Sequence, residues 1–278
     1  MKKIPINEIK NISQASTLQV AEKSLHQLSK FKSSLIDIAN VFLFIFRIIK
    51  NTFAVDFEFK EFIKQCHQIG NKSLALISIT GMIIGLVLTI QSRPILLKFG
   101  AINLLPNMVT ISLIREMGPV ITALICSGKI GSSMGAELGS MRVTEQIDAM
   151  EVSAANPIKF LIVPRVLAAT LMIPLLSLYA DFMGILGSWI GTNIKGQLNF
   201  YLFVSQAFGK VEFSDFVPAI IKSFFFGAVI GLVGCYKGFH AGRGTESVGI
   251  AANTAVVTAS FLVILVDLIA VQLTDLLL

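Results

Sequence analysis

The sequence is poor in charged residues, which make up only 14% of its 278 positions. Soluble domains average about 25% charged residues, so a chain exposed to water over its whole surface is not expected. Its three cysteines, Cys66, Cys126 and Cys235, show no C-x-x-C spacing, so neither a disulfide framework nor a zinc motif is indicated. Its three histidines fall in separate regions, and no Ser-His-Asp or metal-binding constellation can be built around them. We therefore predict no catalytic site, no metal and no cofactor held by this chain.

Motifs that bind nucleotides or nucleic acids are missing as well. The fragment SGKIGSS at residues 127–133 has Ile130 where a P-loop needs Ser or Thr after its lysine, and it lies within an apolar helix pattern. The net charge of +6 comes with no aromatic-basic platform, and nearly half of the 23 Lys and Arg residues lie near the N-terminus. We expect no nucleic-acid partner, and any energy from ATP must come from another subunit.

Long apolar runs are what the sequence has in abundance. Hydrophobic residues make up 54% of the chain. Many of them gather in runs of about 20, which is enough to cross a hydrocarbon core of ~30 Å. We therefore predict an all-α integral membrane protein. Its five spans are expected at about residues 73–91, 108–138, 166–190, 216–236 and 251–273.

The N-terminal region and the basic residues set the expected orientation. Residues 1–34 form a polar tail, and residues 35–50 predict a helix lying in the cytoplasmic interface and closed by Arg47 and Lys50. The alternative for this short stretch is a poor first span. The loops on the opposite side carry few basic residues: Arg93, Lys98, Lys195 and Lys210. This asymmetry predicts a cytoplasmic N-terminus and a C-terminus on the outer side.

Glycines recur at a spacing of four within the predicted spans. They are Gly131, Gly135 and Gly139, Gly187 and Gly191, and Gly227 and Gly231. Small residues at this spacing let helix backbones approach closely in lipid. Packing within the chain explains most of them, and self-association through one such face is the alternative.

Charged residues inside the spans need a reason, because each costs several kcal/mol at membrane depth unless it is paired or wet. Lys222 and Asp267 lie at matching depths near the outer ends of consecutive spans, which predicts an ion pair, with snorkelling of Lys222 as the alternative. Lys129 and Glu137 lie near one face of the second span but too far apart to bond each other. Each is expected to face water, a headgroup or another helix. The other charges in the spans are interfacial or ambiguous: Arg115, Glu116 and Asp181.

The stretch MRVTEQIDAMEV is an acidic helical pattern between two apolar spans. We expect a helix that has Thr144 as its N-cap. Its acids lie along one side and its apolar residues on another: Glu145, Asp148 and Glu151, then Ile147 and Met150. Such a two-faced cytoplasmic helix suits a basic groove on a partner protein, and a solvated loop helix is the alternative.

Two longer strings resemble a known family. GPVITALICSGKIGSSMGAELGSMRVTEQIDAMEV and NPIKFLIVPRVLA closely resemble the MlaE/YrbE family, the permease subunits of ABC transporters that move phospholipids or other lipids between bacterial membranes. The string E-x-G-x-M-[RK]-x-T-E-Q-[IL], from Glu137 to Ile147, is highly specific. IIKSFFFG and LVDLIA, around Lys222 and Asp267, also match family positions. The resemblance covers about residues 35–278, although Lys129 stands where Arg is common.

The resemblance implies partners and contact residues. It implies a homodimeric permease of the bacterial inner membrane, with a periplasmic C-terminus, bound to two copies of an ABC ATPase. It also implies an MCE-domain lipid-binding protein on the outer face and, in many systems, a small STAS-domain protein. The short helix would be the coupling helix in the ATPase groove, with contact residues Glu145, Gln146, Asp148, Met150 and Glu151. The lipid pocket would lie at the dimer interface, lined by Leu88, Gln91, Ile95, Leu96 and Phe99.

Two other functions suit an apolar helical chain less well. A lipid-modifying membrane enzyme needs a nucleophile or a metal cluster, and the sequence offers neither. A passive channel needs polar residues repeated along one helix face, whereas these spans are strongly apolar and suit lipid acyl chains.

Overall fold

The computed structural model describes residues 39–52, 57–194, 196 and 198–277. The predicted polar tail, residues 1–34, lies outside these residues. The chain divides into two compact units, Met1–Lys50 and Asn51–Leu278. Residues 39–52 are helical, which overlaps the stretch predicted to form an interfacial helix. All the elements described below belong to the second unit.

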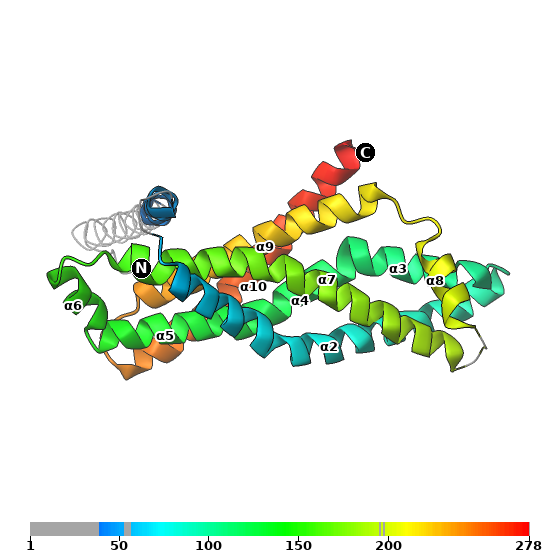
Figure 1. Ribbon diagram of the computed structural model, residues 1–278, viewed down its shortest axis with the longest axis horizontal. Helices are drawn as coiled ribbons and strands as arrows, with labels where there is room; N and C mark the ends of the chain where they lie inside the picture. Colours follow the sequence, from blue (N-terminus) through cyan, green and yellow to red (C-terminus); the bar gives the residue numbers. More distant parts are fainter. Residues whose placement is uncertain (1–38, 53–56, 195, 197, 278) are drawn as a thin grey trace, which may run out of the picture. The chain divides into compact units, whose positions relative to one another are not determined.

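Five helical segments within the described residues are long and apolar enough to cross a membrane. They are α2 (Phe59–Lys98), the interrupted segment Ile102–Val143, the segment Ile158–Asn193, α9 (Phe213–Phe239) and α10 (Thr245–Leu277). Figure 1 shows them packed alongside one another. Every regular element in the described part of the chain is helical, and the predicted all-α membrane fold is confirmed.

The helices extend beyond the predicted spans. α2 begins at Phe59 rather than near residue 73, and it continues through Pro94 to Lys98. An apolar run marks only the part of a helix that suits lipid, whereas backbone hydrogen bonding carries the helix on into its polar flanks. Span prediction therefore located each helix but not its ends.

The second membrane segment is interrupted at its charged residues. Its parts are η1 (Ile102–Leu104), α3 (Leu105–Ser112), η2 (Leu113–Met117), α4 (Gly118–Cys126), η3 (Ser127–Gly131) and α5 (Ser132–Val143). η2 and η3 are π-helical turns, and they contain Glu116 and Lys129 respectively. A third π-helical turn, η4 (Ile158–Ile162), precedes α7 (Val163–Asn193). Such turns occur frequently at functional sites.

α2 packs most extensively against α7, and glycines make this close approach possible. A Cβ atom on Gly85 would overlap the backbone of Gly184, and one on Gly187 would overlap the backbone of α2. A hydrogen bond also crosses the interface, since the Thr89 hydroxyl donates to the Ser188 hydroxyl at 2.7 Å. Close packing between small residues stabilises this interface, because lipid provides no hydrophobic driving force for helix association.

The other glycine pairs also pack within the chain. Gly227 and Gly231 on α9 face the backbone of α7, whereas Gly135 and Gly139 on α5 face α10. These contacts account for the glycine spacing through packing within the chain, without any need for self-association.

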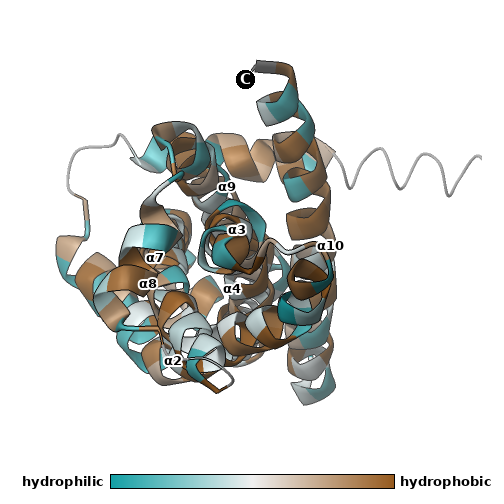
Figure 2. Cartoon of the chain, turned by 90° about the vertical axis from the view of Figure 1, so that its right-hand side faces the viewer, coloured by the Kyte–Doolittle hydropathy of each residue, from teal (hydrophilic) through white to brown (hydrophobic). Residues whose placement is uncertain are grey.

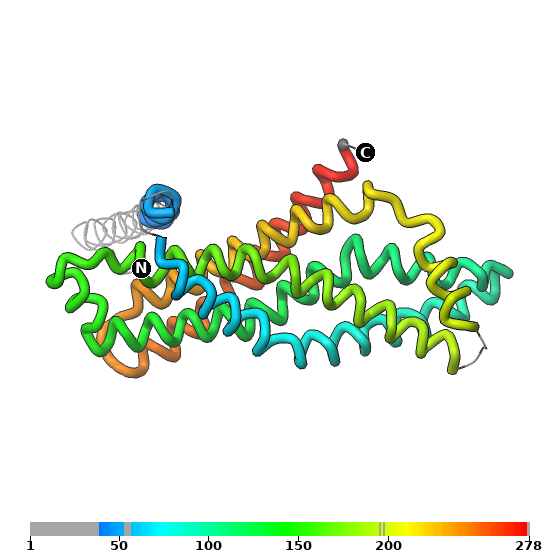
Figure 3. The backbone as a smooth tube through the Cα atoms, viewed as in Figure 1, coloured from blue at the N-terminus to red at the C-terminus, as the bar shows by residue number. Residues whose placement is uncertain are grey.

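The second unit has two distinct ends. α6 (Gln146–Val152) lies at one end, whereas α3 and α8 (Phe200–Phe208) lie at the other, as the backbone trace in Figure 3 shows. Hydrophobic residues cover outer sides of the long helices (Figure 2), among them Ile79 on α2 and Phe261 on α10. Apolar side chains exposed along helices of this length suit contact with lipid.

Candidate functional site

The short helix predicted between the second and third spans is present as α6, but it begins later than expected. α5 continues to Val143, and Thr144 caps the end of α5: its hydroxyl donates to the Ser140 carbonyl at 2.9 Å. Glu145 follows with a φ of 59°, in the left-handed region, and turns the chain into α6. The prediction of Thr144 as an N-cap was wrong, because the preceding helix already offers its hydroxyl a carbonyl four residues back.

α6 has a buried side and an exposed side. Ile147 is fully buried, and Met150 is half-buried. Glu145, Gln146 and Glu151 are exposed. Three of the five residues expected to contact a partner therefore have side chains accessible in this chain.

Asp148 is engaged within the chain. It forms an ion pair with Arg142, which lies at the end of α5. This pair crosses the turn at Glu145 and so fixes the direction of α6 relative to α5. Arg142 had no predicted role, although its position six residues before Asp148, across a short turn, was the available signal.

At the opposite half of the unit, Lys222 lies between two carboxylates. Its Nζ donates to Glu116 Oε2 at 2.9 Å and to Asp267 Oδ1 at 3.0 Å, and its side chain is only 4% exposed. The structure thus brings Lys222 and Asp267 together. Glu116 lies in the π-helical turn η2 and binds the same lysine, a partner that the sequence did not predict.

A second ion pair lies beside this cluster. Arg115, the neighbour of Glu116, binds the buried carboxylate of Asp215 in the first turn of α9. Asp215 also accepts the backbone N–H of Glu212 at 2.9 Å, in a reciprocal capping arrangement. Both charges of η2 are therefore anchored to α9, since Lys222 belongs to the same helix.

Two adjoining cavities open at this cluster. One has a volume of about 460 Å³ and contains most of the charged groups: Arg115, Glu116, Glu212, Asp215, Lys222 and Asp275. The other has a volume of about 620 Å³ and is lined mainly by apolar side chains, including Phe213, Val217, Ile221, Phe225 and Leu273. The two cavities share lining residues that include Lys222 and Thr274, so the charged cavity adjoins an apolar cleft between α9 and α10.

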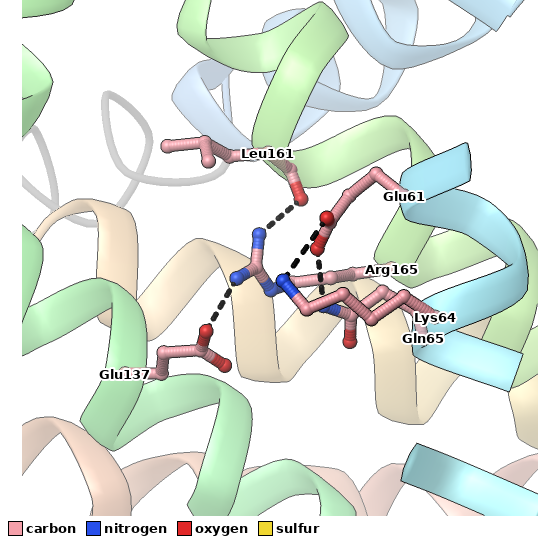
Figure 4. Close-up of polar contacts among 6 residues, drawn as sticks. All are labelled: Glu61, Lys64, Gln65, Glu137, Leu161 and Arg165. Carbon is pink, nitrogen blue, oxygen red and sulfur yellow. Dashed lines mark hydrogen bonds and ion pairs between the residues drawn. The ribbon is translucent and has the colours of Figure 1, made fainter. Parts of the chain in front are cut away.

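Lys129 and Glu137 do not contact each other, as their spacing predicted. Lys129 donates to the backbone carbonyl of Lys72 on α2. Glu137 accepts a hydrogen bond from Arg165 Nη2 at 2.8 Å, shown in Figure 4. Arg165 had no predicted role, because as the third residue of α7 it resembled a flanking basic residue.

Asp181 is buried in the middle of α7. Its carboxyl lies against Gly118, where any Cβ atom would overlap it. Its Oδ1 has no hydrogen-bond partner among the described residues. Gly118 therefore makes room for this acid.

The residues expected to form the lipid pocket lie along the C-terminal part of α2 and at Phe99, which directly follows it. Leu88 and Leu96 pack against the buried cluster of Leu105, Val109 and Leu113. The other three expected residues are exposed: Gln91, Ile95 and Phe99. None of the five lines the two cavities at Lys222. A pocket at a dimer interface would need a second chain to complete it.

The described residues contain no group of three His, Cys, Asp or Glu side chains arranged to hold a metal ion.

Comparison with known proteins shows that the chain is similar to one family of permeases. A family model described as Permease MlaE matches residues 62–273. A probable ABC transporter permease of Rickettsia prowazekii is 36% identical over 211 residues, which cover 76% of this chain and 82% of that protein. The intermembrane phospholipid transport system permease MlaE of Haemophilus influenzae is 35% identical over 209 residues, or 74% and 80% of the two chains. A probable ABC transporter permease of Synechocystis is 35% identical over 197 residues, or 71% and 75%.

Proposed function

The chain belongs to the MlaE family of permeases, and from this premise we propose that it is the transmembrane subunit of an ABC transporter for phospholipids. In this proposal the lipid moves between the bacterial inner membrane and an MCE-domain protein. A separate ATPase subunit hydrolyses the ATP. The name of the Haemophilus relative, an intermembrane phospholipid transport permease, supports the choice of lipid.

The observation that carries the proposal is the pair of adjoining cavities at Lys222. A phospholipid has a charged headgroup and apolar chains, so it needs a polar site that continues into an apolar one. The chamber of about 460 Å³ offers ion-pairing groups, and the adjoining cleft of about 620 Å³ offers apolar walls. Apolar walls can contact acyl chains much as surrounding lipid does, whereas charged groups need partners when buried.

The remaining parts of the proposal concern assembly. α6 is the coupling helix, and it enters a groove on the ATPase through Glu145, Gln146, Met150 and Glu151. The permease is a homodimer bound to two ATPase copies, with the N-terminus cytoplasmic and the C-terminus periplasmic. The outer half of α2 lines a lipid pocket in the dimer, and a STAS-domain protein joins the ATPase in some systems.

The test is charge reversal on α6. We expect Glu145→Lys combined with Glu151→Lys to reduce co-purification of the ATPase about tenfold or more, because like charges across an interface cost several kcal/mol. Asp148 is left unchanged, since reversing it would also break its ion pair with Arg142. The measurement is the amount of ATPase recovered with affinity-purified permease, normalised to permease in the membrane.

Glu246→Lys serves as the control for Glu151→Lys. Glu246 is an exposed acid in the first turn of α10, outside α6. This variant should recover the ATPase as the wild type does. Full recovery with the α6 double variant would show that α6 is not the docking element.

A further inference from the structure

The ion pair between Glu137 and Arg165 joins the two helices that hold α6. Glu137 lies in the middle of α5, and Arg165 lies in the first turn of α7. The two side chains meet at 2.8 Å across 28 residues of sequence, and the intervening chain contains α6 and η4. The pair therefore links the two helices that flank the proposed coupling helix in the chain.

Arg165 is the buried member of the pair. Its side chain is 3% exposed, whereas that of Glu137 is 45% exposed. Its Nη1 donates to the Leu161 carbonyl at 2.7 Å, within the π-helical turn η4. Its Nε has no hydrogen-bond partner among the described residues. Glu137 is its one ion-pair partner within the part of the chain that the structure describes. A buried guanidinium depends strongly on such a partner, because its desolvation is costly.

A third helix, α2, lies near the same guanidinium. Figure 4 shows Arg165 between Glu137 of α5 and Glu61 of α2. Glu61 accepts hydrogen bonds from Gln65 at 2.8 Å and from Lys64 at 3.2 Å. Arg165 thus sits where α2, α5 and α7 converge.

α5 also leads back to the charge cluster at Lys222. α5 is the last part of the interrupted second segment. The turn η2, which carries Glu116, lies earlier in the same segment. Glu116 binds Lys222 on α9. η3 and α4 join α5 to η2, so the Glu137–Arg165 pair and the Lys222 cluster both involve this interrupted segment.

We propose that Glu137 and Arg165 are positioning residues that make α5 and α7 move together when the ATPase displaces α6. This inference rests on the proposed transport function. With the pair intact, a push on α6 shifts both helices as one body and reaches the Lys222 cluster. Without the pair, α5 and α7 respond separately when α6 moves, and less lipid is transferred for each ATP hydrolysed.

The test measures lipid transferred per ATP hydrolysed. The permease is reconstituted with its ATPase and MCE-domain protein in vesicles of phosphatidylethanolamine and phosphatidylglycerol containing a fluorescent phosphatidylethanolamine. The Glu137→Gln variant keeps the shape of the side chain and removes the charge. We expect its transfer-to-hydrolysis ratio to fall about fivefold or more, with the ATPase still bound and thermal unfolding near that of the wild type.

Four further variants complete the design. Glu246→Gln removes an exposed acid far from the pair in sequence and should keep the wild-type ratio. Glu137→Asp keeps the charge and should recover part of the ratio. The exchange Glu137→Arg with Arg165→Glu should also do better than Arg165→Gln alone.

The outcomes separate the two levels of the proposal. If the wild type transfers no lipid in response to ATP, the proposed function fails and this inference fails with it. If the wild type is active but Glu137→Gln keeps its ratio within twofold, the inference alone is wrong. A loss of transfer and hydrolysis in equal proportion, following the amount of folded complex, would likewise overturn it.

Discussion

Lys222 is the residue that holds together the charge cluster formed with Glu116 and Asp267. It is a single cation held by two carboxylates, Glu116 at 2.9 Å and Asp267 at 3.0 Å. Removing Lys222 leaves two acids facing each other beside the cavities. Removing Asp267 leaves Lys222 still paired with Glu116. The structure therefore predicts unequal effects at the two positions, which a simple pair would not produce.

We expect Lys222→Ala to destabilise the protein by about 3 kcal/mol or more, because two charged hydrogen bonds are lost and two carboxylates are left facing each other. Asp267→Ala should cost less, about 1.5–3 kcal/mol, which is the loss of one charged hydrogen bond. Unfolding of the detergent-solubilised variants checks this order, with the level of each variant in the membrane as a second readout. Equal losses at both positions would contradict the role assigned to Glu116.

The exchange Lys222→Asp with Asp267→Lys tests the same cluster by restoration. One cation and two carboxylates remain after the exchange, so part of the loss should be recovered. Strictly additive effects of the two substitutions would show that the side chains act independently.

At the scale of the helices, the tight contact between α2 and α7 depends on missing side chains. We expect Gly85→Ala to destabilise the protein by about 1–3 kcal/mol, because its methyl group would overlap the backbone of Gly184 and force the helices apart. Gly249→Ala is the matched control, since Gly249 lies in α10 and a methyl group added there would have no neighbouring atom within 4 Å among the described residues. Alanine there should be neutral or stabilise the helix by about 1 kcal/mol.

Thermal unfolding in one detergent compares the two glycine variants. If Gly85→Ala unfolds at the wild-type temperature, the α2–α7 contact is able to relax. The glycines would then be tolerated spacing residues and not a requirement of the fold.

At the scale of the whole molecule, the proposed dimer pocket can be tested on α2 alone. Leu96 is a poor position for this test, because it packs against the cluster of Leu105, Val109 and Leu113. Ile95 is better, since 59% of its surface is exposed and a polar replacement disturbs little within the chain. We expect Ile95→Gln to lower the phospholipid that co-purifies with the permease about threefold or more, because acyl chains lose apolar contact worth about 0.8 kcal/mol per methylene.

Ile79→Gln provides the comparison for Ile95→Gln. Ile79 lies on the same helix and is 61% exposed, but it is outside the expected pocket. Lipid quantified by mass spectrometry after identical purification should match the wild type for this variant. Equal lipid loss from both variants would indicate a general effect of polarity on α2.

The sequence located the helices and one of the ion pairs between them. Apolar runs identify membrane helices because crossing lipid demands both length and apolarity. The matching depths of Lys222 and Asp267 in consecutive spans predicted their ion pair. The sequence placed the start of α6 wrongly at Thr144, since a capping residue looks the same whether it ends one helix or begins the next. It also missed Glu116, because its direction depends on the π-helical turn η2, which no local pattern announced.

By itself, therefore, the sequence determined the all-α membrane fold, five spanning helices and the family, because these follow from hydropathy along the chain and from local strings of residues. Only the tertiary structure decided the other charge contacts. Arg165 with Glu137, Arg142 with Asp148, and Glu116 with Lys222 are joined by helix packing and by turns between helices. The partner of a buried charge is set by the rotation and register of neighbouring helices, and small changes in either redirect a side chain to another helix.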